Sequence, residues 1–212
     1  MGLFDAFKKK EKPIAVRLTP EEIELRERLK KGDLLFEKTS AIEQKYKTNQ
    51  NIDEYIAAYQ ALMADPEFAS IKDIWNLRYP STLIDAKRYN EACGALNQVL
   101  LHRKDLTGRV HYMFYEILKA EDRHHADAIF HLMVSYLLRD KGATSPICFY
   151  KENKRIFIKK AKPLGKKIGM SESEIEYCSY LIESQLSQKS FSITALDKKY
   201  KAFLKEKKAA QN

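Results

Sequence analysis

The sequence predicts an all-α protein, built as an array or bundle of helical hairpins with a small C-terminal helical segment. Three observations lead to this prediction. Seven Gly and six Pro in 212 residues are few, whereas sheet-rich folds need many turns. Apolar residues recur at helical spacing along most of the chain. The stretch best suited to a strand, FSIT at 191–194, is too short and isolated to hold a sheet.

The N-terminal third of the chain carries the clearest helix signals. TPEE places Thr19 before Pro20 and two acids in the first turn, which predicts a helix start. Gly32 is a possible break, and we expect a second helix through residues 42–46. The segment NQNIDEYIAAYQALMADP then combines a cap, an apolar stripe and a terminal Pro, so it predicts another helix.

The remainder of the chain reads as further helices. A helical stretch around residues 74–77 is expected to stop at Pro80. Successive helices follow, with junctions near Lys87, residues 105–108 and Asp122. After that we predict helices at 149–161, 163–168, 171–186 and 193–207.

Composition and charge set the expected domain organisation. Hydrophobic residues make up 44% of the chain, which is enough for a core. Seven Lys and Arg155 against Glu152 give residues 151–167 a net charge of +7, out of +9 for the whole chain. Basic ends of this kind favour an anionic partner, although a solvated surface is the alternative. The expected divisions are an arm (1–18), a body (19–141), a linker (142–148) and a basic C-terminal segment (149–212).

The sequence favours a cytoplasmic location. No run approaches the roughly 18 to 20 apolar residues that a membrane span needs, and the lysines at 8–10 follow the first apolar residues, unlike those of a secretory signal. Cys93, Cys148 and Cys178 form no C-x-x-C pair. Neither a disulfide framework nor a cysteine zinc site is therefore expected, which fits a reducing compartment.

Three segments look alike: DEYIAAYQAL at 53–62, NEACGALNQVL at 90–100 and ADAIFHLMVSYL at 126–137. Each places a small or medium residue four positions before a larger one, a spacing that lets two helices approach and fills the next layer. The small or medium residues are Tyr55, Ala92 and Ala128, and the larger ones are Tyr59, Leu96 and Leu132.

This pattern resembles the tetratricopeptide repeat, a pair of helices of about 34 residues. KRYNEACGAL at 87–96 is the most similar stretch, and the resemblance covers roughly residues 25–140. The usual Gly of the first helix is absent, since Glu43, Pro80 and Glu116 stand there. An ordinary helical bundle is the alternative interpretation.

The tetratricopeptide resemblance implies an open groove that binds peptides or partner helices, lined by the first helix of each pair. Tyr and Arg suit such a surface because they bury apolar area while keeping polar reach. The alternative is that the tyrosines belong to the core. The candidate groove residues are Asn76, Arg78, Tyr79, Tyr112, Tyr115 and Lys119.

LGKKIGMSESEI at 164–175 resembles the core of a helix-turn-helix unit. Gly169 permits a left-handed turn, Ser171 with Glu174 predicts a capping box, and Gly165 allows close helix packing. Glu172 and its neighbouring acids stand where DNA would be contacted, which argues against base reading. A capped helical hairpin is the simpler alternative.

Any nucleic-acid contact by this basic segment would use phosphates without sequence choice. The candidate anion-binding residues are Lys154, Arg155, Lys159, Lys160, Lys162, Lys166 and Lys167.

The strongest metal candidates are His124, Asp127 and His131, which share one helix face and could hold zinc. No H-E-x-x-H motif accompanies them, and nucleophile-elbow, phosphate-loop and dinucleotide motifs are missing from the sequence. We therefore predict no catalytic residue, no metal and no cofactor.

The N-terminal arm MGLFDAFKKKEKP forms a short amphipathic element if it is helical, with Leu3, Phe4 and Phe7 on one edge. Such an element can make weak, reversible contact with an anionic membrane. Docking onto protein and a loose end are the alternatives.

The sequence as a whole favours a non-enzymatic interaction scaffold or adaptor with basic ends, which binds an unidentified protein partner. The first alternative is a nucleic-acid-associated protein that uses residues 151–175. The second is a metal-dependent enzyme that uses the histidine cluster. The sequence does not indicate the oligomeric state.

Overall fold

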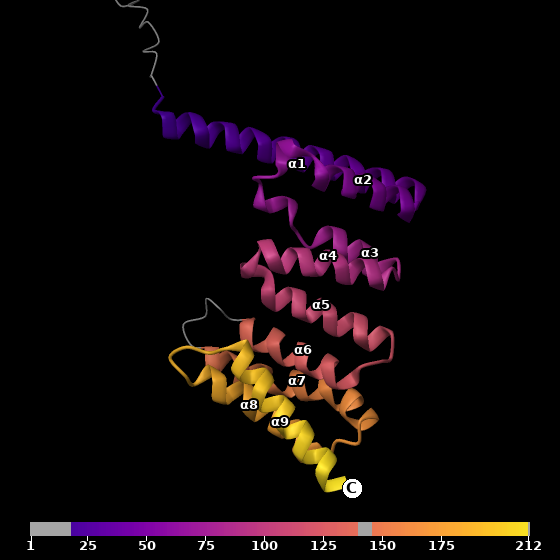
Figure 1. Ribbon diagram of the computed structural model, residues 1–212, viewed down its shortest axis with the longest axis vertical. Helices are drawn as coiled ribbons and strands as arrows, with labels where there is room; N and C mark the ends of the chain where they lie inside the picture. The colour runs from indigo at the N-terminus through magenta and orange to yellow at the C-terminus, as the bar shows by residue number, and fades with distance from the viewer. Residues whose placement is uncertain (1–17, 140–145, 212) are drawn as a thin grey trace, which may run out of the picture. The chain divides into compact units, whose positions relative to one another are not determined.

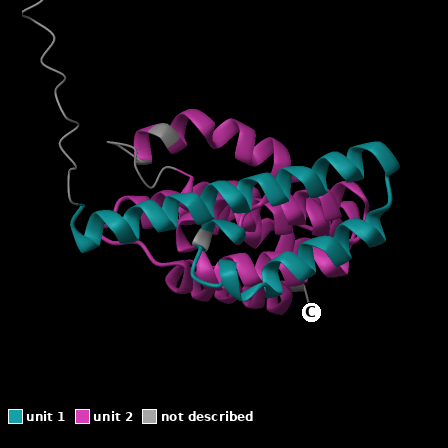
Figure 2. Ribbon diagram, turned by 90° about the horizontal axis from the view of Figure 1, so that it is seen from above, with its two compact units in different colours: residues 1–74 teal, residues 75–212 magenta. Residues whose placement is uncertain are grey.

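The computed structural model describes residues 18–139 and 146–211, and it confirms the all-α class: these residues form nine α-helices and three short 3₁₀-helices, with no strand among them. The chain divides into two compact units, one ending at Ile74 and the other beginning at Trp75 (Figure 2). The two units are described separately. The predicted arm (1–18) falls outside the described residues except for Leu18.

The first unit contains a helical hairpin of α1 (Pro20–Asn49) and α2 (Ile52–Ala64), followed by η2 (Pro66–Phe68) and η3 (Lys72–Ile74). The predicted start of α1 is confirmed: the Thr19 side chain accepts from the backbone N–H of Glu22, whose carboxylate accepts from the Thr19 N–H at 2.7 Å. The break expected at Gly32 and the separate helix at 42–46 are wrong. One Gly inside a helix costs only about 1 kcal/mol, which a 30-residue helix can absorb.

Buried tyrosines hold this hairpin together. Tyr55 and Tyr59 of α2 lie 4.9 Å apart between ring centroids, and the Tyr59 hydroxyl lies 3.2 Å from the Glu43 carboxylate of α1. Gln50 turns the chain with a left-handed backbone, and Asn51 caps α2 as predicted. Because α2 has 13 residues and α1 has 30, the first turns of α1 extend beyond the hairpin.

The second unit contains seven α-helices (Figure 1). The junctions expected near Lys87 and Asp122 are confirmed, and both residues have a left-handed backbone. The prediction of a helix at 74–77 that stops at Pro80 is wrong. Pro80 lies instead in the first turn of the next helix, where a backbone N–H would have no intrahelical partner, so a proline is tolerated there. The helices are α3 (Arg78–Asp85), α4 (Tyr89–His102), α5 (Thr107–Ala120), α6 (His125–Leu138), α7 (Pro146–Lys167), α8 (Glu172–Leu186) and α9 (Ile193–Gln211), with η4 (Lys104–Leu106) before α5.

Within this unit, α3 packs on α4 and α5 packs on α6 as hairpins. The two similar segments at 90–100 and 126–137 each fall in the second helix of their hairpin. Ala92, Leu96, Ala128 and Leu132 are all fully buried. The four-residue spacing noted in the sequence therefore marks core positions.

Helix α7 is continuous, so the break expected between residues 161 and 163 is wrong. Pro163 lies inside the helix and removes one hydrogen bond to the carbonyl of Lys159. Both residues are exposed. Water can therefore satisfy that carbonyl, which lowers the cost of a proline in this position.

The turn between α7 and α8 confirms the predicted local structure. Gly169 has φ 69°, and the Met170 N–H donates to the Gly165 carbonyl at 2.8 Å, which closes a Schellman motif. Ser171 and Glu174 form the capping box of α8. A Cβ atom at Gly165 would overlap the Ile175 side chain, so the close packing of the two helices needs glycine there.

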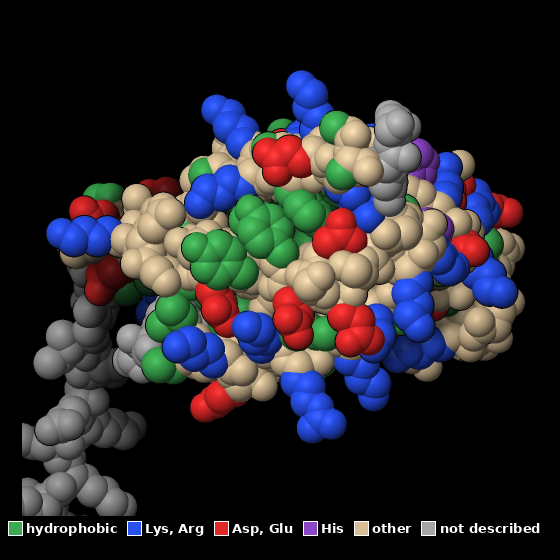
Figure 3. All heavy atoms as spheres, turned by 90° about the horizontal axis from the view of Figure 1, so that it is seen from below, with side chains coloured by type: hydrophobic (Ala, Val, Ile, Leu, Met, Phe, Trp, Pro, Cys, Tyr) green, Lys and Arg blue, Asp and Glu red, His purple; other side chains and the backbone are tan. Residues whose placement is uncertain are grey.

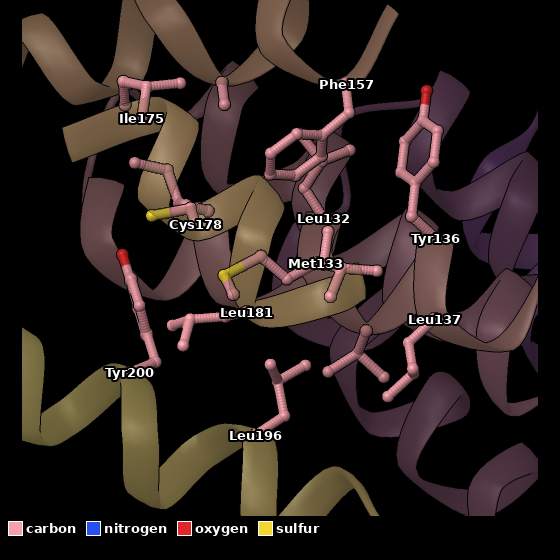
Figure 4. Packing of buried hydrophobic residues seen from close by; sticks show 14 of the residues in the cluster. Leu132, Met133, Tyr136, Leu137, Phe157, Ile175, Cys178, Leu181, Leu196 and Tyr200 are labelled. Atoms are coloured by element: carbon pink, nitrogen blue, oxygen red, sulfur yellow. The ribbon is translucent and has the colours of Figure 1, made fainter. Parts of the chain in front are cut away.

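The core of this unit is centred on α6, which packs against α5, α7, α8 and α9. Side chains from these helices converge in one apolar cluster (Figure 4), including Leu132, Phe157, Leu181 and Leu196. The C-terminal helices thus share their core with α5 and α6. The predicted linker (142–148) lies largely outside the described residues.

Apolar side chains also reach the surface of the second unit. Tyr177 and Tyr180 of α8 stack with centroids 6.0 Å apart, and Phe203 of α9 lies 5.1 Å from Tyr177. Figure 3 shows hydrophobic side chains gathered among charged ones on the face that it views. Among the described helices, none combines the length and the apolar character that crossing a bilayer requires.

Candidate ligand-binding groove

A groove of about 940 Å³ lies in the second unit. Its walls come from α3, α5, α6 and α7, together with η4. Its lining includes Ser81, Asp105, Arg109, Tyr112, Tyr136, Arg139 and Lys160.

Close packing between the start of α5 and the end of α6 shapes one end of the groove. A Cβ atom at Gly108 would lie 3.0 Å from the Cβ of Leu138, so glycine lets α5 approach the end of α6 closely. Arg109 and Arg139, the residues that follow Gly108 and Leu138, both line the groove. Two guanidinium groups are thereby brought to the same cleft from different helices.

Lys160 of α7 and Tyr112 of α5 form the central contact of the groove. The Lys160 ammonium donates to the Tyr112 hydroxyl at 2.6 Å and lies 4.5 Å from the ring centroid. Arg139 lies 5.8 Å from the ring centroid of Tyr136. Each cation therefore lies beside an aromatic side chain, which favours a defined position for its charge.

Burial raises the pKa of both tyrosines in the groove. For Tyr136 the nearby Lys160 and Arg139 oppose that rise, whereas for Tyr112 a hydrogen bond with Glu116 adds to it. Both phenols therefore stay protonated at neutral pH and present hydroxyl groups that can donate or accept hydrogen bonds.

The groove has a positive charge. Arg109, Arg139 and Lys160 line it, and Asp105 is the one carboxylate among the described residues that line it. Arg103 neutralises that carboxylate through Nη2–Oδ2 and Nε–Oδ1 contacts of 2.9 and 3.0 Å. Such a lining can bind carboxylates or phosphates through charge-assisted hydrogen bonds and can seat apolar groups on Leu77 and Leu106.

Of the six residues predicted to line a groove, Tyr112 does so. Tyr79 and Tyr115 are 7% and 2% exposed, so their rings belong to the core and offer a partner almost no surface. The Asn76 side chain accepts from the backbone N–H of Arg78 at 2.9 Å at the start of α3. Lys119 is exposed and pairs with Glu116 at 3.4 Å.

The predicted anion-binding residues fall into three groups: those in ion pairs, one that lines the groove, and those exposed on α7. Lys154 pairs with Glu183 at 3.3 Å, Lys162 pairs with Glu172, and Lys167 pairs with Asp122. These contacts tie α7 to α8 and to the end of α5. Lys160 lines the groove, while Arg155, Lys159 and Lys166 are exposed on α7 and make no ion pair within the described ranges.

The candidate zinc residues do not converge. His131 faces His111 of α5 with 3.0 Å between their Nδ1 atoms, while His124 lies 3.7 Å from Asp127 on the surface. Residues 18–139 and 146–211 contain no group of three or more side chains placed to hold a metal ion. Leu3, Phe4 and Phe7 lie outside the described residues.

Sequence reasoning missed Arg109 and Arg139. A Gly immediately before Arg109, at the start of a predicted helix, was the available signal of a close helix approach. For Arg139 the signal was its position at the end of an almost wholly apolar helix, where a charged side chain must reach the surface. Comparisons of the chain with protein-family models, curated proteins and solved structures found no significant match.

Proposed function

We propose that this protein is a non-enzymatic interaction scaffold whose groove holds an acidic segment of a partner protein. The observation that carries the proposal is the convergence of Arg109, Arg139 and Lys160, from three helices, on one groove of about 940 Å³. Two phenol hydroxyls stand beside the cations. This combination supports anion binding with apolar contacts on either side.

The helical arrangement supports a peptide as the ligand. The tetratricopeptide resemblance implies a groove lined by the first helix of each pair, and α3 and α5 are the first helices of the two hairpins in this unit. An extended or helical peptide fits such an open cleft, whereas small-molecule sites are usually more enclosed. The family resemblance itself stays part of the proposal.

The test is fluorescence polarisation with labelled twelve-residue peptides that interleave Glu with Leu, compared with the same peptides carrying Gln in place of Glu. We expect binding of the acidic peptides, weakened about tenfold or more in Arg109→Glu and in Lys160→Glu. Lys198→Glu on exposed α9 makes the same charge change outside the groove and should bind normally. Equal binding of the Glu and Gln peptides would count against the proposal.

A second candidate function, phosphate binding on nucleic acid, is favoured by a separate observation on α7. Five cations fall within roughly 80° of the helix circumference at 100° per residue. Four of them are exposed, and the fifth, Lys162, pairs with Glu172. The stripe consists of Lys151, Arg155, Lys159, Lys162 and Lys166.

A cationic stripe of this kind follows a phosphate backbone without reading its sequence. The test is polarisation of duplex DNA and of RNA across a salt series. If the stripe binds, Lys159→Glu with Lys166→Glu should weaken binding and reduce the salt slope by about two, while Lys198→Glu should not. Absence of binding at low salt would reject this candidate.

A further inference from the structure

Helix α1 carries an apolar stripe whose side chains are each more than half exposed. Leu25, Leu29 and Phe36 are 56%, 60% and 59% exposed. Their spacing of i, i+4 and i+11 places them within roughly 40° of one another around the helix. Leu35 and Thr39, the buried residues of α1, lie about 60° to 100° around the helix from the centre of this stripe, so the exposed stripe ends at Phe36.

The stripe has the spacing of a coiled-coil seam. With Leu25 at position d of a heptad, Leu29 takes a, Gly32 takes d and Phe36 takes a. Residues 19–31 are all exposed, so no other described part of the first unit covers this side of the helix. The helix is already formed, and a partner would need only to lie along it.

The charges beside the seam select the partner. On the same heptad, Glu21 and Arg28 occupy g positions, and Arg26 and Asp33 occupy e positions. In a parallel pair each g residue faces the e residue five positions later on the other helix. Glu21 would therefore face Arg26 of a second copy, and Arg28 would face Asp33 of that copy.

These four charged side chains are exposed, and they make no ion pair within the described part of the chain. A second copy would supply all four with opposite charges, twice over by symmetry. We therefore infer that α1 mediates parallel, in-register self-association of the chain through Leu25, Leu29 and Phe36.

The antiparallel arrangement in the register that pairs Leu25 with Leu29 fits less well. Centring it between Leu25 and Leu29 buries both leucines and places Phe36 on Leu18 of the second copy. It also brings Arg26 near Arg26 and Arg28 near Arg28 of that copy, and like charges at flanking positions oppose association. The seam is short, with three apolar layers per helix, so the dimer should be weak, with a dissociation constant roughly in the micromolar range or above.

The experiment is sedimentation velocity of the full chain over a concentration series from about 1 to 500 μM. The expected result is a shift from monomer to dimer as concentration rises. Leu25→Gln combined with Leu29→Gln should weaken the dimer tenfold or more without unfolding the helix, because both side chains are exposed. Ile23→Gln is the matched control: Ile23 is 46% exposed on the same helix but lies outside the seam.

Charge reversal tests the orientation. Arg28→Glu should weaken the dimer, and adding Asp33→Arg should restore it, whereas adding Glu21→Arg should not. A chain that stays monomeric throughout the series would overturn the inference, as would a dimer insensitive to Leu25→Gln with Leu29→Gln. Rescue by Glu21→Arg in place of Asp33→Arg would overturn the parallel arrangement.

Discussion

Lys160 and Tyr112, 48 positions apart in the sequence, meet with 2.6 Å between the ammonium nitrogen and the phenol oxygen. The contact joins α7 to α5 across the groove. It brings together one residue expected to bind anions and one expected to bind a protein partner. Residues from the two candidate sets, which lie far apart in the sequence, thus line one groove.

A double-mutant cycle measures this contact. Lys160→Met and Tyr112→Phe should each destabilise the chain, and their effects should fail to add by about 1 kcal/mol, because either change alone removes the same interaction. The measurement is urea unfolding followed by circular dichroism. Lys198→Met with Tyr112→Phe serves as the distant pair and should be additive.

Two glycines offer a paired prediction about helix packing. Gly165→Ala should destabilise the chain by about 1 to 3 kcal/mol, since its Cβ would overlap Ile175 and crowd Met170. Gly94→Ala should stabilise it by about 0.5 to 1 kcal/mol, because nothing lies within 4 Å of the new Cβ and alanine favours the interior of α4. Denaturation midpoints of the two variants provide the test. Equal effects in the two variants would show that α7 and α8 do not pack as described.

The fold class and the helix ends were predictable because they depend on local chemistry. Thr19 and Ser171 cap their helices through side chains only three residues from their partners, and Gly169 turns the chain where its own backbone allows it. Gly32 and Pro163 misled the prediction. Whether such a residue ends a helix depends on the packing and hydrogen bonds of the rest of that helix, which cannot be read from the residue alone.

The groove was harder to predict because its residues come from four separate helices. Tyr112 and Tyr115 look equivalent in the sequence, yet Tyr115 points into the core and Tyr112 lines the groove. Lys159 and Lys160 are adjacent in the sequence, yet Lys160 lines the groove while Lys159 lies on the exposed surface of α7. Burial of this kind depends on long-range packing, which the spacing of one helix does not determine.

The shared core predicts the outcome of a truncation. A chain ending at residue 145 loses α7, α8 and α9, which cover Leu132 and Met133 of α6. These buried side chains would then face water, at about 1.5 to 3 kcal/mol for each one uncovered. We expect the truncated chain to lose cooperative unfolding and to bind a hydrophobic dye. A monomeric truncated chain that melts cooperatively would instead show that the C-terminal helices form a separable domain.

The His111–His131 pair predicts a loss of stability in mild acid. Burial lowers the pKa of His111 to about 4 and also lowers the pKa of His131, although the nearby Asp127 partly opposes the shift for His131. Phe114 and Phe130 pack against the two rings, so neither imidazolium would be well solvated. Between pH 6.5 and 4 the unfolded chain therefore binds a proton at position 111 that the folded chain does not bind.

The contribution of His111 to stability must accordingly fall as the pH drops through this window, and it is constant above about pH 7.5. For His111 alone the loss between pH 7.5 and 5 is about 2 kcal/mol. Urea unfolding at both pH values measures it, and His111→Gln should remove that part of the loss. His124→Asn is the control, since His124 is exposed and its left-handed backbone suits asparagine. An unchanged pH dependence in His111→Gln would mean that the ring is not buried in its neutral form.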